Sequence, residues 1–162
     1  MPHTKELREQ LAQFIDSKDA HATADAAMAD LEFKQQGKRP KGLEHSAWEL
    51  LEHIRLTQHD ILDFCVNPKY EAGDWPTDYW PKRATPPDAK AWKKSAKGFR
   101  ADRDALRALA TDAKTTDLFA KIPHGDGQTY LRELLLAQDH LSYHTGQLIL
   151  VRQLLGAWHP AK

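Results

Sequence analysis

The last long segment of the chain, from about residue 128 to residue 156, carries a stripe of apolar side chains at helical spacing. Residues three and four positions apart lie on the same side of an α-helix, so a helix that packs against a core repeats its apolar residues at these steps. Seven positions follow this spacing: Leu134, Ala137, Leu141, His144, Leu148, Val151 and Leu155. One of them is a histidine, and His140 lies beside it. Because a buried imidazole without a partner is costly, we expect partners for both rings.

Three further segments are predicted to be helical, and the chain lacks the alternating pattern that is typical of β-strands. Their approximate ranges are 3–34, 45–66 and 88–113. The first is expected to break or bend near residues 16–19 and to continue as a helix through Ala24, Ala27, Met28 and Leu31. Together with the last segment they predict an all-α four-helix bundle, in a single domain over residues 1–162.

The connection between the second and third helices, residues 67–87, is unusually long and contains five prolines and four aromatic residues. Connections between neighbouring helices of a bundle are usually about 2–8 residues long. We therefore interpret this one as a crossover loop that lets the second and third helices run parallel. Trp75, Tyr79 and Trp80 are expected to clamp it to one end of the bundle. The alternative is a loop that its aromatic residues hold in place and that has no further role.

A third histidine, His53, is expected to point into the bundle from the second helix. It lies three residues after Leu50 and beside Ile54, on the apolar stripe of that helix. Three inward imidazoles on two facing helices suit a divalent first-row metal ion, above all Zn²⁺ or Ni²⁺. The alternative is that each ring is an ordinary buried histidine with a hydrogen-bond partner, since a chain with nine histidines contains such spacings by chance.

The sequence resembles the DinB-like (YfiT-like) superfamily of helical-bundle metalloproteins. The segments that carry the resemblance are HLSYHTGQLILVRQLLG (140–156), WELLEHI (48–54), WPTDYWP (75–81) and IPHGDGQT (122–129). The resemblance implies a bundle with a long crossover between the second and third helices. It also implies a metal ion held by His53, His140 and His144. Characterised relatives include thiol-dependent transferases and isomerases, and relatives are often dimers.

A site with three protein ligands keeps a coordination position open, which is typical of catalytic rather than structural metal sites. Such an ion lowers the pKa of bound water to about 7 or activates a thiol. The histidine pair is not the HExxH motif of metalloproteases, and no glutamate has the histidine three residues later that di-iron bundles use. We therefore expect a metal-dependent enzyme of the thiol S-transferase or hydrolase type, with no catalytic residue identified. The alternative is a non-catalytic, stress-related metal-binding protein.

Several other polar residues are weighed as parts of this site. Gln147 and Glu133 lie on the histidine side of the last helix and are candidates to orient a ligand ring. His124 is a candidate proton carrier at the rim, and His21 is a candidate ligand or ligand partner. The remaining three residues are expected to be structural or exposed: His45, His59 and Cys65.

Charge and composition limit the partners of the protein. Lys plus Arg and Asp plus Glu both number 23, so no net charge favours nucleic acid or a membrane surface. A single cysteine and the lack of long apolar stretches predict a soluble, cytoplasmic protein. The expected partner is a small-molecule thiol or electrophile. Gly146, in the middle of the last helix, suggests close approach by a second subunit, so a homodimer is expected.

Overall fold

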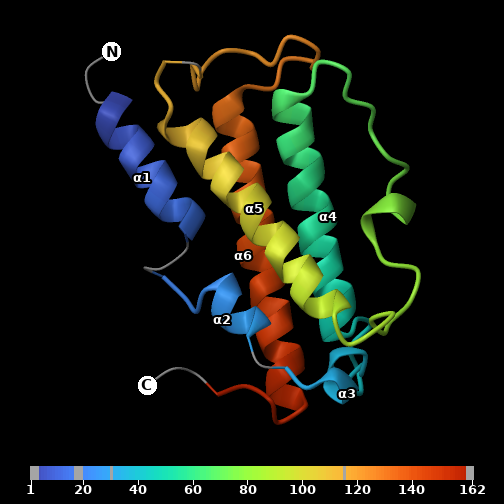
Figure 1. Ribbon diagram of the computed structural model, residues 1–162. Coiled ribbons are helices and arrows are strands. Elements are labelled where there is room, and N and C mark those ends of the chain that lie inside the picture. Colours follow the sequence, from blue (N-terminus) through green and yellow to red (C-terminus); the bar gives the residue numbers. More distant parts are fainter. Residues whose placement is uncertain (1–3, 17–19, 30, 115, 160–162) are drawn as a thin grey trace.

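The computed structural model describes residues 4–16, 20–29, 31–114 and 116–159, and within these ranges it is all-α (Figure 1). The elements are α1 (Thr4–Asp16), α2 (Ala24–Met28), α3 (Phe33–Gln36), α4 (Ala47–Val66), the 3₁₀ turn η1 (Thr77–Tyr79), α5 (Ala91–Thr111) and α6 (Tyr130–Leu154). Four of them, α1, α4, α5 and α6, are the major helices and pack together, which confirms the predicted four-helix bundle. None of the helices in the described ranges has the length and apolar character to cross a bilayer.

The three long helices begin and end close to the predicted positions, and a polar side chain caps the start of each. The side chain of Ser46 caps α4 and forms a reciprocal capping box with Glu49. Thr129 caps α6 by accepting from the backbone N–H of Arg132 at 3.2 Å. Asp88 accepts from the N–H of Ala91 at 2.9 Å, so α5 begins three residues later than predicted. The apolar stripes of these helices form the core, with Leu50, Phe99 and Leu148 almost fully buried.

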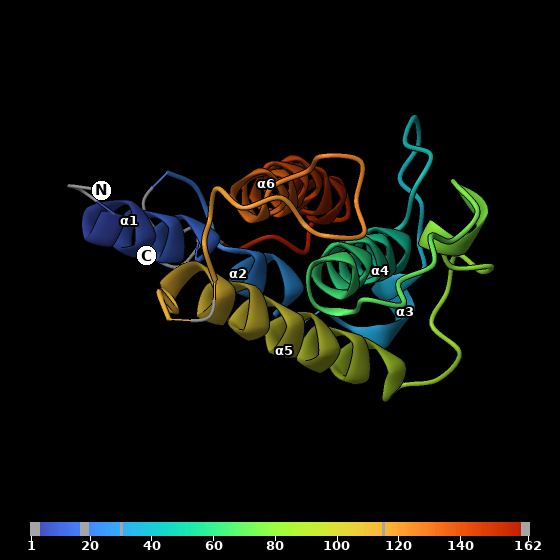
Figure 2. The same ribbon diagram turned by 90° about the horizontal axis from the view of Figure 1, so that it is seen from above.

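The crossover between α4 and α5 runs back along the outside of α4, so that these two helices point in the same direction (Figures 1 and 2). This confirms the predicted parallel arrangement. The expected attachment to one end of the bundle is wrong, because η1 contacts the side of α4. The hydroxyl of Tyr79 donates to Asp60 at 3.0 Å, and the ring of Trp80 stacks on His53. Trp75 is 68% exposed and contributes only ring contacts, with centroids 5.2 Å from Tyr79 and 6.2 Å from His53.

The first segment differs most from the prediction of a helix over residues 3–34 that breaks or bends near residues 16–19, since it forms α1, α2 and α3. The predicted interruption is confirmed, because α1 ends at Asp16 and residues 20–23 are not helical, while residues 17–19 lie outside the described residues. Thr23 caps α2, but α2 ends after five residues, and Ala29 is extended with φ −74° and ψ 149°. Leu31 is nevertheless buried. The apolar spacing of this stretch therefore correctly predicted which residues are buried. It did not correctly predict a continuous helix.

Arg152 of α6 replaces helical hydrogen bonds in this short segment. Its guanidinium donates to the carbonyl of Ala27 at 2.7 Å and also to that of Ala29. It also donates to the carbonyl of Ala157 at 3.0 Å, and only 5% of the residue is exposed. Buried backbone carbonyls need hydrogen-bond donors, and the guanidinium of Arg152 supplies them here. This one buried cation therefore connects α2 and the segment after α6 to the bundle.

Replacing Arg152 with alanine is expected to lower the free energy of unfolding by about 3 kcal/mol, because buried carbonyls lose charged donors. Urea unfolding followed by circular dichroism measures the change. Arg83→Ala is the control, because Arg83 is exposed and its loss is expected to cost less than about 0.5 kcal/mol. Equal losses in the two variants would contradict the role of Arg152.

Candidate metal centre

His53 enters the centre from α4, seven residues into the helix. It is buried, with 2% of its surface exposed. Its Nδ1 lies 2.7 Å from the backbone carbonyl oxygen of Tyr79, in the crossover. The indole of Trp80 stacks on the ring at 3.8 Å between centroids and 4° between planes. Two consecutive residues of the crossover thus hold the orientation of this imidazole.

His140 and His144 enter from α6, one turn apart. His144 is buried, as its place in the apolar stripe predicted, and His140 is half-buried. The Nδ1 atom of His144 lies 2.7 Å from the side-chain oxygen of Gln147. The Nδ1 atom of His140 lies 3.2 Å from the hydroxyl of Thr57, which belongs to α4. Each ring is therefore held on one edge by a neighbouring oxygen.

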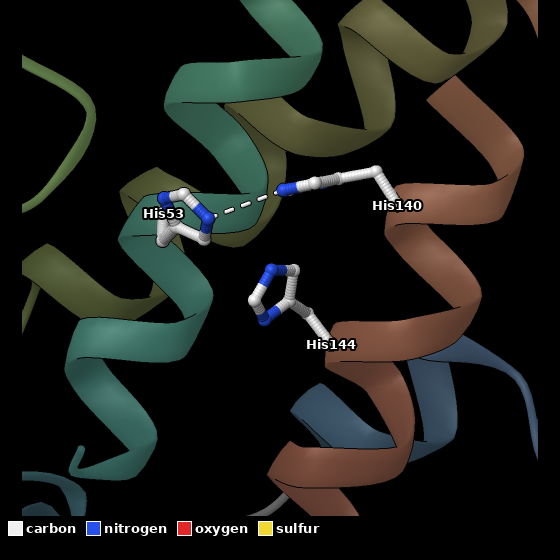
Figure 3. Close-up of side chains that lie close together, drawn as sticks. All are labelled: His53, His140 and His144. Atoms are coloured by element: carbon white, nitrogen blue, oxygen red, sulfur yellow. Dashed lines mark hydrogen bonds between the residues drawn. The ribbon is translucent and has the colours of Figure 1, made fainter. Parts of the chain in front are cut away.

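The three rings point toward one another (Figure 3). The Nε2 atoms of His53 and His140 are 3.1 Å apart, and each of the three residues offers one nitrogen within 4.8 Å of the others. The ring centroids are separated by 4.9 Å between His53 and His140, 4.6 Å between His53 and His144, and 4.4 Å between His140 and His144. The predicted convergence of the three side chains is present in the structure.

The hydrogen bonds on the outer edges of the rings determine which nitrogens carry protons. The carbonyl oxygen of Tyr79 can only accept, so Nδ1 of His53 donates to it. Thr57 donates its hydroxyl hydrogen to the carbonyl of His53 at 2.7 Å, so its oxygen accepts from Nδ1 of His140. The side-chain oxygen of Gln147 likewise accepts from Nδ1 of His144. In the neutral form, all three Nε2 atoms are then unprotonated acceptors, and two of them face each other without a hydrogen between them.

The surroundings of the rings also favour their neutral form. Burial lowers the pKa of His53 from its ordinary 6.5 to about 4, with smaller lowering by the charges of His144 and His45. Burial lowers the pKa of His140 to about 3, helped by the other two histidines of the cluster. The pKa of His144 is lowered as well, again mainly by burial. Neutral imidazoles with free Nε2 lone pairs are the form that binds metal ions.

Comparison with known proteins gives the family of the chain. The family model described as the DinB superfamily matches residues 18–148, which include all three histidines of the cluster. The chain belongs to the DinB superfamily. Neither the curated proteins nor the solved structures contain a match to it.

A pocket of about 520 Å³ opens beside the cluster and reaches His144 and Gln147. It lies between the start of α4, the segment around Gly42 to His45, the crossover at Trp80, and the second half of α6. Its volume is within the range typical of small-molecule sites. The DinB-superfamily chain thus combines a buried cluster of three imidazoles with an adjoining space large enough for a ligand.

The other residues considered from the sequence have mixed outcomes. Gln147 orients a ring of the cluster, as predicted, whereas Glu133 binds Arg132 at 2.6 Å and does not contact the cluster. His124 is exposed and its Nε2 contacts the carbonyl of Phe64, three turns of α4 away from His53, so its place at the rim is wrong.

Two further histidines of the described residues and the cysteine lie outside the cluster. His21 is exposed and lies 3.4 Å from the hydroxyl of Ser142, so it is not a ligand or a partner of one. His59 is exposed beside Asp102, as expected. Cys65 is buried at the end of α4, and burial raises the pKa of its thiol to about 12, so the thiol is structural.

Two contributors to the centre were missed from the sequence. Thr57 lies four residues after His53, and this helical spacing was a usable signal that it shares the same side of α4. His45 precedes the cap of α4 and stacks on Trp80 at 4.1 Å between centroids. Trp80 therefore has imidazoles against it from both His45 and His53. No local pattern predicts that stack, because it depends on the path of the crossover.

We expect chelator-treated protein to lose stability as the pH falls from 6.5 to about 4. In this window the unfolded chain protonates histidines at their ordinary pKa while burial keeps His53 and His140 neutral in the folded chain. The unfolded state then binds more protons, so the free energy of unfolding decreases with decreasing pH. Urea unfolding at several pH values measures the slope. The slope of the free energy of unfolding against pH should be shallower in His53→Asn. It should be unchanged in His59→Asn, where the ring is exposed. Equal slopes in the parent and both variants would contradict the contribution of His53.

Proposed function

We propose that this DinB-superfamily protein binds one divalent metal ion through the Nε2 atoms of His53, His140 and His144 and that it is a metal-dependent enzyme of the thiol S-transferase or hydrolase type. The observation that carries the proposal is the pair of Nε2 acceptors of His53 and His140, which face each other at 3.1 Å. Two lone pairs in this arrangement need a positive charge or a hydrogen between them. A metal cation bound to all three rings would supply the positive charge.

The donor set and its spacing fit a first-row divalent ion. Two nitrogens bound to tetrahedral zinc at about 2.0–2.1 Å are separated by about 3.3 Å, close to the separation seen between His53 and His140. Imidazole ligands suit Zn²⁺ and Ni²⁺, and metal-bound imidazoles normally donate their second N–H to an oxygen. Tyr79, Thr57 and Gln147 supply these three oxygens.

The enzyme proposal is supported by the space beside the centre. Three protein ligands leave room for an exogenous ligand, and the bound ion would supply Lewis acidity to water or to a thiol. The chain's own residues hold the rings, cover His53 with the indole of Trp80, and form the pocket that reaches His144. A substrate in this pocket would lie directly against one of the three ligand side chains.

One observation favours the alternative, a non-catalytic and stress-related metal-binding protein. In the described part of the chain, the Nδ1 atoms of the three rings donate to a carbonyl, a hydroxyl and a side-chain amide oxygen, and none donates to a carboxylate. General acid–base catalysis is most often carried out by histidine or a carboxylate within hydrogen-bond reach of the substrate. A centre whose rings have no carboxylate partner would suit storage or sensing of the ion.

Metal analysis of the purified protein tests the proposed site. We expect close to one Zn²⁺ or Ni²⁺ per chain in the parent and in His59→Ala, and loss of bound metal in His53→Ala and His144→Ala. His59 is the matched control because it is an exposed histidine of the same helix as His53. Circular dichroism establishes that the variants are folded. Equal metal content in all four proteins would contradict the site.

The same proteins separate the enzyme from the alternative. Metal-loaded parent is assayed for hydrolysis of phenyl esters and for loss of a thiol in the presence of an electrophile. Turnover that disappears in His144→Ala and persists in His59→Ala supports the enzyme. Stoichiometric metal without turnover in either assay supports the non-catalytic protein.

We also propose that the protein is a homodimer that uses the exposed face of α6. The support is Gly146, where an added Cβ would have no atom within 4 Å, and the exposed Leu135 and Leu154 on the same helix. A free glycine in the middle of a helix is destabilising by about 0.5–1 kcal/mol relative to alanine, so its presence suits a closely packed neighbour.

Gly146→Ala tests the dimer. If a second subunit packs against Gly146, the added methyl group is expected to weaken association, as measured by sedimentation velocity across micromolar concentrations. A parent that is a monomer at these concentrations, with Gly146→Ala more stable by about 0.5–1 kcal/mol, would reject it.

A further inference from the structure

The pocket beside the centre has walls made mainly of carbon. The aliphatic part consists of Leu43, Leu50, Leu150 and Val151. Leu50 and Val151 are each 1% exposed and belong to the core, so this side of the pocket cannot move away easily. Leu150 is 43% exposed and lies toward solvent. A ligand in the pocket would therefore bury apolar surface against a rigid inner wall and a solvent-facing leucine.

Two aromatic residues of the wall, Trp80 and Tyr143, differ in how much of their ring faces is covered. Trp80 is stacked on both His45 and His53, which leaves its edge for a ligand. Tyr143 is 64% exposed and meets His144 edge-on, with 4.9 Å between centroids and 84° between planes. The ring of Tyr143 is thus available to pack against a planar group.

The charged groups at the pocket are of one sign. Glu44 is the single acidic residue of the lining, and neither lysine nor arginine contributes to it in the described structure. His45, Tyr143 and Gln147 add neutral polar atoms. An anionic group at the open side of the pocket, away from the histidines, would be desolvated without a lysine or arginine to compensate it and would be repelled by Glu44. A neutral ring-bearing ligand meets no such cost.

We propose that this pocket binds the uncharged, ring-bearing apolar part of the substrate and discriminates against anionic molecules. The orientation of the ligand in the pocket rests on the proposed function, which places the reactive end of the substrate at His144. It assigns the pocket to an electrophile, because the pocket contains no cationic side chain to bind a thiol that carries carboxylate or phosphate groups. Tyr143 and Leu150 are the specificity-determining residues at its open side.

A pair of probes with the same shape and different charge tests the proposal. Methyl phenyl sulfone is neutral, and benzenesulfonate replaces its methyl group with a negatively charged oxygen. Titration followed by ligand-observed NMR gives both dissociation constants with the protein as purified. We expect the sulfone to bind at least tenfold more tightly than the sulfonate. Equal affinities, or no binding of the sulfone at millimolar concentration, would overturn the proposal.

Two pairs of variants locate the binding. Leu150→Asn should weaken sulfone binding about fivefold to tenfold through lost apolar contact, whereas Leu135→Asn should not change it. These leucines are 43% and 44% exposed on the same helix, and only Leu150 lines the pocket. Glu44→Lys should raise the affinity for the sulfonate about tenfold, and Glu71→Lys, an exposed glutamate of the crossover, should not. If the two variants of either pair changed the dissociation constant by the same factor, the assignment of the binding site to this pocket would be overturned.

Metal analysis of the purified protein, together with the sulfone titration before and after chelator treatment, separates the pocket proposal from the metal-site proposal. If the purified protein contains no metal and sulfone binding still depends on Leu150, the metal-site proposal fails and the pocket stands. If the protein contains metal and the sulfone does not bind, the pocket proposal alone fails.

Discussion

The arrangement of the centre depends on the proton at Nδ1 of each histidine. Three oxygens from different parts of the chain accept hydrogen bonds from these N–H groups, namely the carbonyl of Tyr79, the hydroxyl of Thr57 and the side-chain amide of Gln147. Because each acceptor lies on the outer edge of its ring, the Nε2 lone pairs are directed inward. Burial then keeps the rings neutral by lowering their pKa. A cluster of like lone pairs in a protein interior is unfavourable by itself, and this is the physical reason to expect a cation among them.

The crossover connects this constraint to the topology of the bundle. Parallel α4 and α5 require a long return, and the chain takes it along the outside of α4 (Figure 1). Asp60 anchors the return by accepting from the hydroxyls of Tyr70 at 2.9 Å and Tyr79 at 3.0 Å. The same residues place the Tyr79 carbonyl and the Trp80 ring against His53. The loop is thus a structural part of the centre, and the alternative of a loop held by its aromatic residues without a further role does not describe it.

Much of the bundle could be predicted from local patterns. Apolar spacing located α4, α5 and α6, and it placed His53 and His144 on inward faces because a helix repeats every 3.6 residues whatever it packs against. The same reasoning failed in the first segment. There, Leu31 is buried without being helical, and Arg152 supplies donors to carbonyls that a longer helix would have used. Spacing reports burial, and burial by itself does not require a helix.

The sequence by itself determined the helical class, the inward faces and the one-turn separation of His140 and His144. These follow from interactions between residues that are near one another along the chain. Tertiary structure alone decided that His53 and His140 meet, that Thr57 serves a histidine 83 positions away, and that Trp80 lies between His45 and His53. It also decided that His124 and His21, which were candidates for secondary roles at the site, lie elsewhere. The physical reason is that helix periodicity sets which face a side chain occupies, whereas only the packing of helices and the path of the crossover set which faces come together.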